Sequence, residues 1–85
     1  MYELKFDEKA IDFLEKLQKH IKERIFSKLL AAKNDPFHFF ERLEGKEIYK
    51  LRVGDYRILA DIDNRSKSIQ IVLIRHRKNV YDRIR

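Results

Sequence analysis

The 85-residue sequence contains no cysteine, one proline and two glycines. The absence of cysteine excludes disulfide bonds and thiolate metal sites. No HExxH-type spacing indicates another metal site, so we expect no cofactor. No stretch rich in proline, glycine or serine offers a linker, and residues 1–85 are expected to form one domain. No apolar run could span a membrane and no secretory segment opens the chain, which makes a cytoplasmic location the default expectation.

The positive charge is concentrated in the C-terminal quarter of the chain. The formal net charge is +6, and residues 65–85 hold seven lysines and arginines against one acid, Asp82. This segment accounts for the whole excess, and the first 64 residues are balanced. Such asymmetry indicates a polyanion or an acidic protein as the partner. A basic tail that is merely solvated would show the same pattern.

Residues 47–63 predict a β-hairpin around which the rest of the chain is organised. β-Branched and aromatic residues alternate with charged ones on both sides of Gly54-Asp55, a pair typical of a hairpin turn. Successive side chains of a strand point to opposite faces. If the apolar rows of both strands cover the core, Lys50, Arg52 and Arg57 come together on the other face. Three fixed cations on one face of a small domain indicate a site for an anion.

The segment before this hairpin predicts a strand and a pair of helices. Residues 2–6 alternate apolar and charged side chains, as expected of a first strand. Asp7 is a suitable N-cap for a helix that carries Ile11 and Leu14 in its core stripe. A second helix is expected over residues 21–33, and the single proline of the sequence ends it.

The remaining residues predict a further strand and a terminal helix. Residues 36–46 contain three phenylalanines without a clean period, and we expect a loop, or a loop with one helical turn, that packs these rings under the core. Stacking of these rings on RNA bases is the less favoured alternative. The nearly unbroken apolar run of residues 68–74 is typical of a central strand. Residues 80–85 are expected to form a short helix. The predicted fold is α+β: an N-terminal strand, a helical hairpin packed on a small, mainly antiparallel four-stranded sheet, and the short C-terminal helix.

Two motifs, YKLRVGDYRI at residues 49–58 and IVLIRHRKNVYDRI at residues 71–84, together with the order of the elements, resemble the RelE/ParE superfamily of toxins from toxin–antitoxin systems. Members close to RelE are endoribonucleases that cut mRNA in the ribosomal A site without a metal, whereas ParE relatives share the fold and act on DNA gyrase. The resemblance favours the nuclease branch. The alternatives are a ParE-like gyrase poison and a noncatalytic module that binds nucleic acid or the ribosome.

The resemblance implies which residues form the site. The residues that match catalytic positions of the family are Lys50, Arg57, Arg77 and Tyr81. Further RNA or phosphate contacts are expected from Lys46, Arg52, Arg75, His76 and Lys78. A second family lysine, two residues before Lys50, is replaced by Ile48 in this sequence. The implied partners are a cognate RelB-like antitoxin, the ribosome and mRNA.

The chemistry of RNA cleavage matches these residue types. Attack by the 2′-hydroxyl requires removal of its proton, stabilisation of charge on the phosphorane and a proton for the leaving 5′-oxygen. Arg57 suits the middle role because arginine is always protonated and forks onto phosphate oxygens. Lys50 would take or stabilise the proton of the nucleophile, Arg77 the phosphate or leaving oxygen, and Tyr81 would stack on a base or shift a proton. We expect Lys50, Arg57 and Arg77 to share one pocket for a single phosphate.

Overall fold

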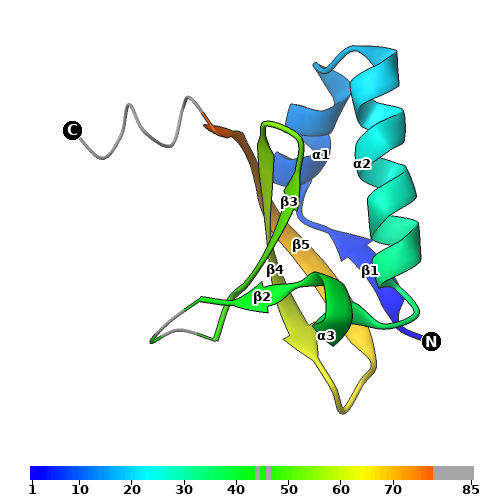
Figure 1. The fold of residues 1–85 in the computed structure, drawn as a ribbon, viewed down its shortest axis with the longest axis vertical. Coiled ribbons are helices and arrows are strands. Elements are labelled where there is room, and N and C mark those ends of the chain that lie inside the picture. The colour runs from blue at the N-terminus through cyan, green and yellow to red at the C-terminus, as the bar shows by residue number, and fades with distance from the viewer. Residues whose placement is uncertain (44, 46, 78–85) are drawn as a thin grey trace.

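The computed structural model describes residues 1–43, 45 and 47–77 (Figure 1). In these residues the elements are, in chain order, β1 (Glu3–Phe6), α1 (Glu8–Glu15), α2 (Lys19–Ala32), α3 (Pro36–Phe39), β2 (Glu41–Arg42), β3 (Tyr49–Val53), β4 (Tyr56–Asp63) and β5 (Ser68–His76). The strands form one sheet in the order β1-β5-β4-β3-β2. β1 is parallel to β5, and the other neighbouring strands are antiparallel. The predicted α+β class with a mainly antiparallel sheet is confirmed.

β3 and β4 form the predicted hairpin. Val53 pairs with Tyr56, so Gly54 and Asp55 make a two-residue turn between the strands. Gly54 has a φ of 59°, in the left-handed region that glycine adopts without strain and that tight hairpin turns require. The turn thereby fixes the register of the two strands, and with it the face on which each side chain lies.

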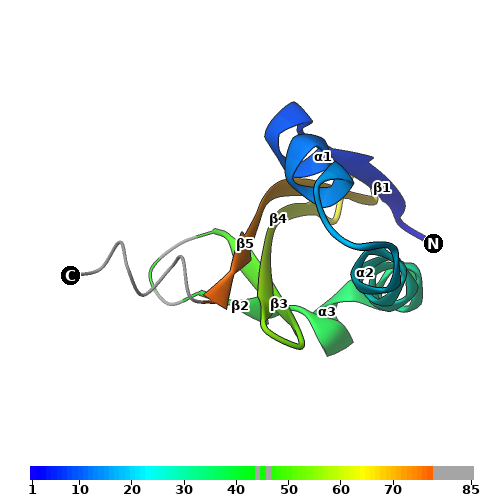
Figure 2. The ribbon, with the colours of Figure 1, turned by 90° about the horizontal axis from the view of Figure 1, so that it is seen from above.

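α1 and α2 lie on the same side of the curved sheet, which Figure 1 and Figure 2 show from two directions. Buried apolar side chains of the two helices meet those of the strands in one core. The helices contribute Ala10, Leu14, Ile25, Leu29 and Ala32, and the three C-terminal strands contribute Leu51, Val53, Ile58, Ala60, Ile62, Ile69, Ile71 and Ile74. The opposite face of β3, β4 and β5 is left open by both helices.

An irregularity in β5 decides which of its side chains face the helices. Consecutive residues of β4 pair with Leu73 and Ile71, so Val72 is an extra residue in the strand. Such a β-bulge reverses the alternation of side chains beyond it. Ile71 and Ile74 are therefore both buried although they are three positions apart.

One strand was not predicted. β2 adds a fifth strand where four are expected, because Glu41 and Arg42 pair with β3. A two-residue strand is too short for an alternating pattern to reveal it. α3 is the helical turn allowed for in the segment after the proline, where Phe40 is buried but Phe37 is 48% exposed. The helix predicted over residues 80–85 lies outside the described residues.

The helical hairpin is present, but α2 begins two residues before the predicted start and ends one residue earlier, and the core stripe of α1 is shifted by one position. Ile11, expected in the core, is 41% exposed, whereas Ala10 and Leu14 are buried. Residues four apart lie on one helix face, so placing Ala10 and Leu14 against the sheet turns Ile11 outward. Exposed Phe26 of α2 contacts the ring of Phe6, with centroids 5.8 Å apart.

In the described part of the chain, no helix has the length and apolar character needed to cross a membrane.

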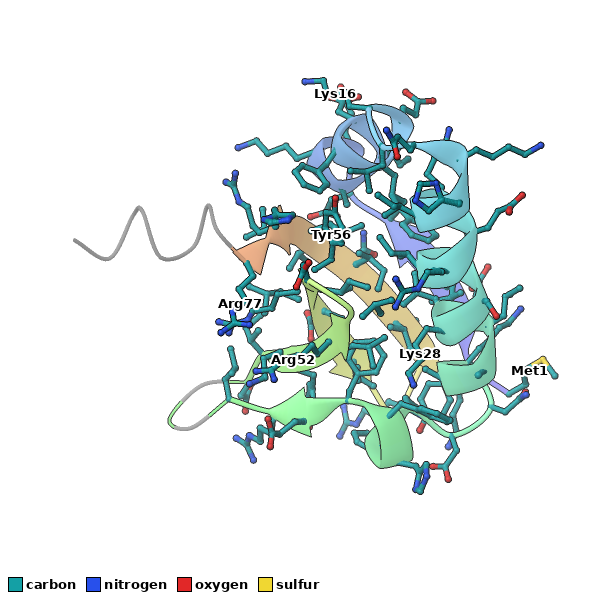
Figure 3. All side chains as sticks on the ribbon, turned by 45° about the horizontal axis from the view of Figure 1, so that its top comes forward. Met1, Lys16, Lys28, Arg52, Tyr56 and Arg77 are labelled. Carbon is teal, nitrogen blue, oxygen red and sulfur yellow. The ribbon has the colours of Figure 1, made fainter. Side chains whose placement is uncertain are left out.

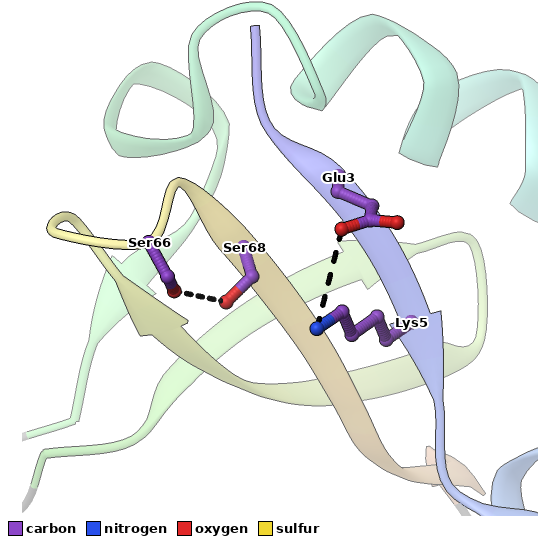
Figure 4. Close-up of polar contacts among 4 residues, drawn as sticks. All are labelled: Glu3, Lys5, Ser66 and Ser68. Carbon is purple, nitrogen blue, oxygen red and sulfur yellow. Dashed lines mark hydrogen bonds and ion pairs between the residues drawn. The ribbon is translucent and has the colours of Figure 1, made fainter.

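The turn between β4 and β5 lies at the other end of β4 from the hairpin turn. The Asp63 carboxylate accepts a hydrogen bond from the Arg65 backbone N–H at 2.9 Å. The hydroxyl groups of Ser66 and Ser68 are 2.8 Å apart (Figure 4). The hydrogen bond from the Arg65 N–H, and to a smaller extent the one from the Ser66 hydroxyl, holds the pKa of Asp63 below its ordinary value. This turn is therefore stabilised by its own short-range hydrogen bonds.

β1 is the edge strand of the sheet, next to β5. Its backbone is tied at both ends, because the Glu3 N–H donates to Lys67 and the Asp7 N–H donates to Ile71. The exposed ion pair between Glu3 and Lys5, at 4.0 Å, contributes little because water screens it (Figure 4). The parallel pairing of β1 is thus set by backbone hydrogen bonds, remote from the cations of the hairpin.

Candidate functional site

Four arginines gather near the β3–β4 turn on the face that the helices leave open. Arg52 pairs with Arg57, and Arg57 pairs with Arg75 of the next strand. Side chains of paired residues lie next to each other on one face of a sheet. We call these three residues the arginine row. Arg77 lies beside the row, because its backbone N–H donates to the carbonyl oxygen of Asp55 at 2.6 Å.

The arginine row is poorly explained by fold stability. Like charges directly opposite each other destabilise a sheet. Among the described residues, no carboxylate forms an ion pair with Arg52, Arg57 or Arg75. Uncompensated cations in adjacent strands are, however, what an anion-binding surface requires.

Arg52, Arg57 and Arg77 line one shallow concavity beside the hairpin turn, together with Gly54, Asp55 and Tyr56. Its volume is about 10 Å³, so an anion would lie on this surface and not inside it. Guanidinium groups are planar and present paired donors that match two oxygens of a phosphate. The geometry therefore suits a phosphate that remains part of a longer chain.

A second and larger hollow lies at the edge of the sheet. We call it the edge pocket; it has a volume of about 740 Å³, and the residues that matter below are Lys28, His38, Phe39, Glu41, Lys50 and Arg52. The pocket exists because β2 pairs only with Tyr49 and Lys50, which leaves the rest of β3 without a neighbouring strand on that side. Arg52 lines both hollows and joins them.

Lys50 lies in the edge pocket and not in the concavity with Arg57 and Arg77. By strand alternation it shares the face of Arg52, as predicted from the hairpin. Its ammonium nitrogen is 3.2 Å from a carboxylate oxygen of Glu41, and its side chain is 20% exposed. The single pocket expected for Lys50, Arg57 and Arg77 is thus divided in two, because Arg57 pairs with Arg52 and Lys50 lies two positions further along β3.

His76 lies on the helix-covered face, away from the arginine row. Its ring contacts that of Tyr56 at right angles, with centroids 5.0 Å apart, and Tyr56 in turn contacts Phe13 of α1. The bulge at Val72 sets this orientation, because it places Arg75 outward and its neighbour His76 inward. His76 is therefore separated by the sheet from the phosphate site to which the sequence assigns it.

The other predicted site residues, Lys46, Lys78 and Tyr81, lie outside the described residues. Two residues of the edge pocket, Lys28 and Glu41, are not predicted from the sequence, and Phe39 is expected in the core. Nothing in the sequence marks Lys28 or Glu41 as site residues, because the pocket forms only where α2, α3, β2 and β3 meet in the folded chain. Within the described ranges, no three histidine, aspartate or glutamate side chains are grouped so as to hold a metal ion.

The sequence was compared with protein-family models and with curated proteins. Residues 4–81 match the family described as the ParE toxin of type II toxin-antitoxin system, parDE. The match includes the arginine row and Arg77. The comparison with curated proteins found no match.

The fold is similar to chains in several solved complexes. In the RelBE2 toxin–antitoxin complex from Mycobacterium tuberculosis, the similar chain is 25% identical with a TM-score of 0.81, over 89% of this chain and 98% of that chain. The archaeal RelE–RelB complex from Pyrococcus horikoshii gives 25% identity and a TM-score of 0.78, over 89% and 94%. The intact E. coli RelBE complex gives 26% identity and a TM-score of 0.75, over 87% and 94%.

Proposed function

Because this chain belongs to the ParE toxin family of type II toxin–antitoxin systems, within the RelE/ParE superfamily that its motifs indicate, we propose that it is a RelE-like toxin that cleaves ribosome-bound mRNA. The observation that carries the proposal is the arginine row, with Arg77 beside it, on the open face of the sheet. Such a surface binds the phosphates of a nucleic acid. The similarity of the fold to three RelE-containing complexes supports the nuclease branch.

In the proposed reaction the 2′-hydroxyl of the RNA attacks the adjacent phosphorus. The bond from O2′ to phosphorus forms, the bond from phosphorus to O5′ breaks, and the products are a 2′,3′-cyclic phosphate and a 5′-hydroxyl. One proton leaves O2′ and one is gained by O5′. Negative charge accumulates on the phosphorane oxygens, and donors already in place there lower the barrier. Arg57 has this role because it is the centre of the arginine row.

Lys50 is proposed to act on the attacking 2′-oxygen from the side of the edge pocket. Its ion pair with Glu41 has to open or shift when RNA binds, and this costs little because the Glu41 side chain is 74% exposed. Arg77 is proposed to stabilise the phosphate or the leaving oxygen. Tyr81 keeps the proposed role of stacking on a base or shifting a proton.

The proposed partners are a RelB-like antitoxin, the ribosome and mRNA. The three similar structures are named as complexes of RelE with RelB, and we extend that pairing to this chain. The basic C-terminal quarter of the sequence offers an acidic antitoxin segment a complementary surface. Cleavage of translated messages places the protein in the cytoplasm.

Primer extension on an mRNA, with and without ribosomes, tests the proposal. The purified chain should cut the message only where ribosomes are present, and Arg57→Ala should lower the cleavage rate by about 10² or more. Arg65→Ala is the matched control, because Arg65 is an exposed arginine in the turn at the far end of β4. An Arg57→Ala protein that cuts as fast as the Arg65→Ala protein would refute the role of the arginine row.

A second candidate function is poisoning of DNA gyrase, and the description of the matching family as ParE favours it. In that case messages would stay intact while supercoiling of plasmid DNA fails in the presence of the chain. A third outcome is binding without cleavage. Arg57→Ala would then only weaken nucleic-acid binding and reduce the salt slope by about 1, as for a single phosphate contact.

A further inference from the structure

The concavity and the edge pocket are joined through one residue. Arg52 lines the former with Arg57 and Arg77 and the latter with Lys50, and in the view of Figure 3 it lies between Arg77 and Lys28. Lys50 and Arg52, two positions apart in a strand, are separated by about 7 Å. A nucleotide whose phosphate lies on the arginine row therefore has the edge pocket within reach.

The edge pocket contains an ion pair, whereas no carboxylate among the described residues is paired with the arginine row. Three cations, Lys28, Lys50 and Arg52, are accompanied by the carboxylate of Glu41, which is 3.2 Å from the Lys50 ammonium. A carboxylate repels a phosphate, but it accepts hydrogen bonds from base amino groups such as that of cytosine. The mixture of charges therefore suits a nucleobase better than a second phosphate.

Phe39 gives the edge pocket an aromatic surface. It is half-buried, the Lys28 ammonium lies over its ring at 5.6 Å from the centroid, and the His38 ring meets it at right angles with centroids 5.0 Å apart. A cation–π contact at an exposed site is weaker than the stacking of a base on an aromatic ring. A base can therefore displace the flexible lysine side chain, which remains near enough to contact a phosphate.

From these contacts we propose that the edge pocket holds the base next to the cleaved phosphate, stacked on Phe39, and that Glu41 selects bases with an amino group over uracil. Adenine, cytosine and guanine each bring an amino donor to the carboxylate. Uracil instead presents carbonyl oxygens on both sides of its single N–H, and these repel a carboxylate. The pocket volume of about 740 Å³ lies within the range of ligand sites. This inference rests on the proposed function, because it takes the RNA to lie on the arginine row.

The test is the rate of cleavage on ribosomes programmed with four messages that differ only in one base beside the cut, first on its 5′ side and then on its 3′ side. Glu41→Gln should reduce the discrimination against uracil by about five-fold or more, because an amide can donate to a uracil carbonyl. Glu47→Gln is the control, since Glu47 is an exposed acid that does not line the edge pocket.

Phe39→Leu should slow cleavage of all four messages by about five-fold or more, through loss of stacking. Phe37→Leu, on the same helix but outside the pocket lining, is the control, and Phe39→Tyr should restore the rate because it keeps an aromatic face. Thermal unfolding of each variant verifies that it is folded.

The outcomes separate this inference from the function on which it rests. A parent chain that cuts the messages, with Glu41→Gln and Phe39→Leu indistinguishable from their controls, overturns the base pocket alone. A parent chain that discriminates against no base overturns the role of Glu41. A parent chain that cuts no message on ribosomes overturns the proposed function and the base pocket together.

Discussion

Neutralising the centre of the arginine row should make the protein more stable while it loses activity. Arg57 has a like charge on each side, Arg52 in β3 and Arg75 in β5. Two charges about 6 Å apart in water repel by about 0.7 kcal/mol, which lies within the range for cross-strand pairs. Arg57→Gln removes two such pairs and should raise the free energy of unfolding by about 1.4 kcal/mol. Arg52→Gln removes one pair and should raise it by about 0.7 kcal/mol.

Urea unfolding is the appropriate assay, because guanidinium chloride is itself a salt and would screen the effect. For a domain of 85 residues, the gain of Arg57→Gln corresponds to a rise in Tm of about 6 to 11 °C. The Debye length is about 30 Å at 0.01 M salt and about 3 Å at 1 M, so the gain should be present at low salt and largely lost at high salt. Arg65→Gln controls for the loss of one positive charge, because Arg65 lies in the turn between β4 and β5 and is not paired with another arginine.

The stability gains of the three variants distinguish repulsion between paired arginines from an effect of net charge. A stability gain that follows the number of paired arginines, and that salt removes, would identify repulsion as its cause. Equal gains in all three variants would show that only net charge matters. A loss of stability in Arg57→Gln at low salt would mean that packing of the arginine stem outweighs the repulsion, and the row would then have a structural explanation.

Two further predictions concern the two turns of β4. Gly54→Ala should lower the free energy of unfolding by about 1 kcal/mol or more in the same urea assay. An alanine is strained at a φ of 59°, and its Cβ would lie 3.1 Å from the Arg24 guanidinium. Gly54→Asn should lower the free energy of unfolding less, because asparagine tolerates this backbone conformation better. Asp63 has a pKa below its ordinary value of 3.8, so its contribution to stability is present above that value and is lost as the pH falls through the lower, folded-state pKa. The stability difference between the parent chain and Asp63→Asn should therefore shrink as the pH is lowered below 3.8, and a difference that does not change with pH would contradict the assignment.

The part of the fold that can be predicted from the sequence is the part with a local cause. Alternation and a Gly-Asp turn are sufficient to predict β3 and β4, and a proline is sufficient to end α2. The same alternation predicts that Arg52 and Arg57 share a face, which their pairing in the structure shows. β2 has no local signal because it is two residues long, and the edge pocket depends on how α2, α3 and β3 meet.

The face on which the last cations of β5 lie depends on a single extra residue. Counted as a regular strand from Ile69 and Ile71, β5 would place Arg75 on the helix-covered face and His76 on the open face. The bulge at Val72 reverses this order and brings Arg75 opposite Arg57. A bulge is stable here because it lets Ile74 join the core, which offsets one unpaired residue in the ladder. Burial of Ile74 on the helix-covered face thus places the charge of Arg75 on the open face. No short sequence pattern predicts this placement, because it depends on pairing between β4 and β5.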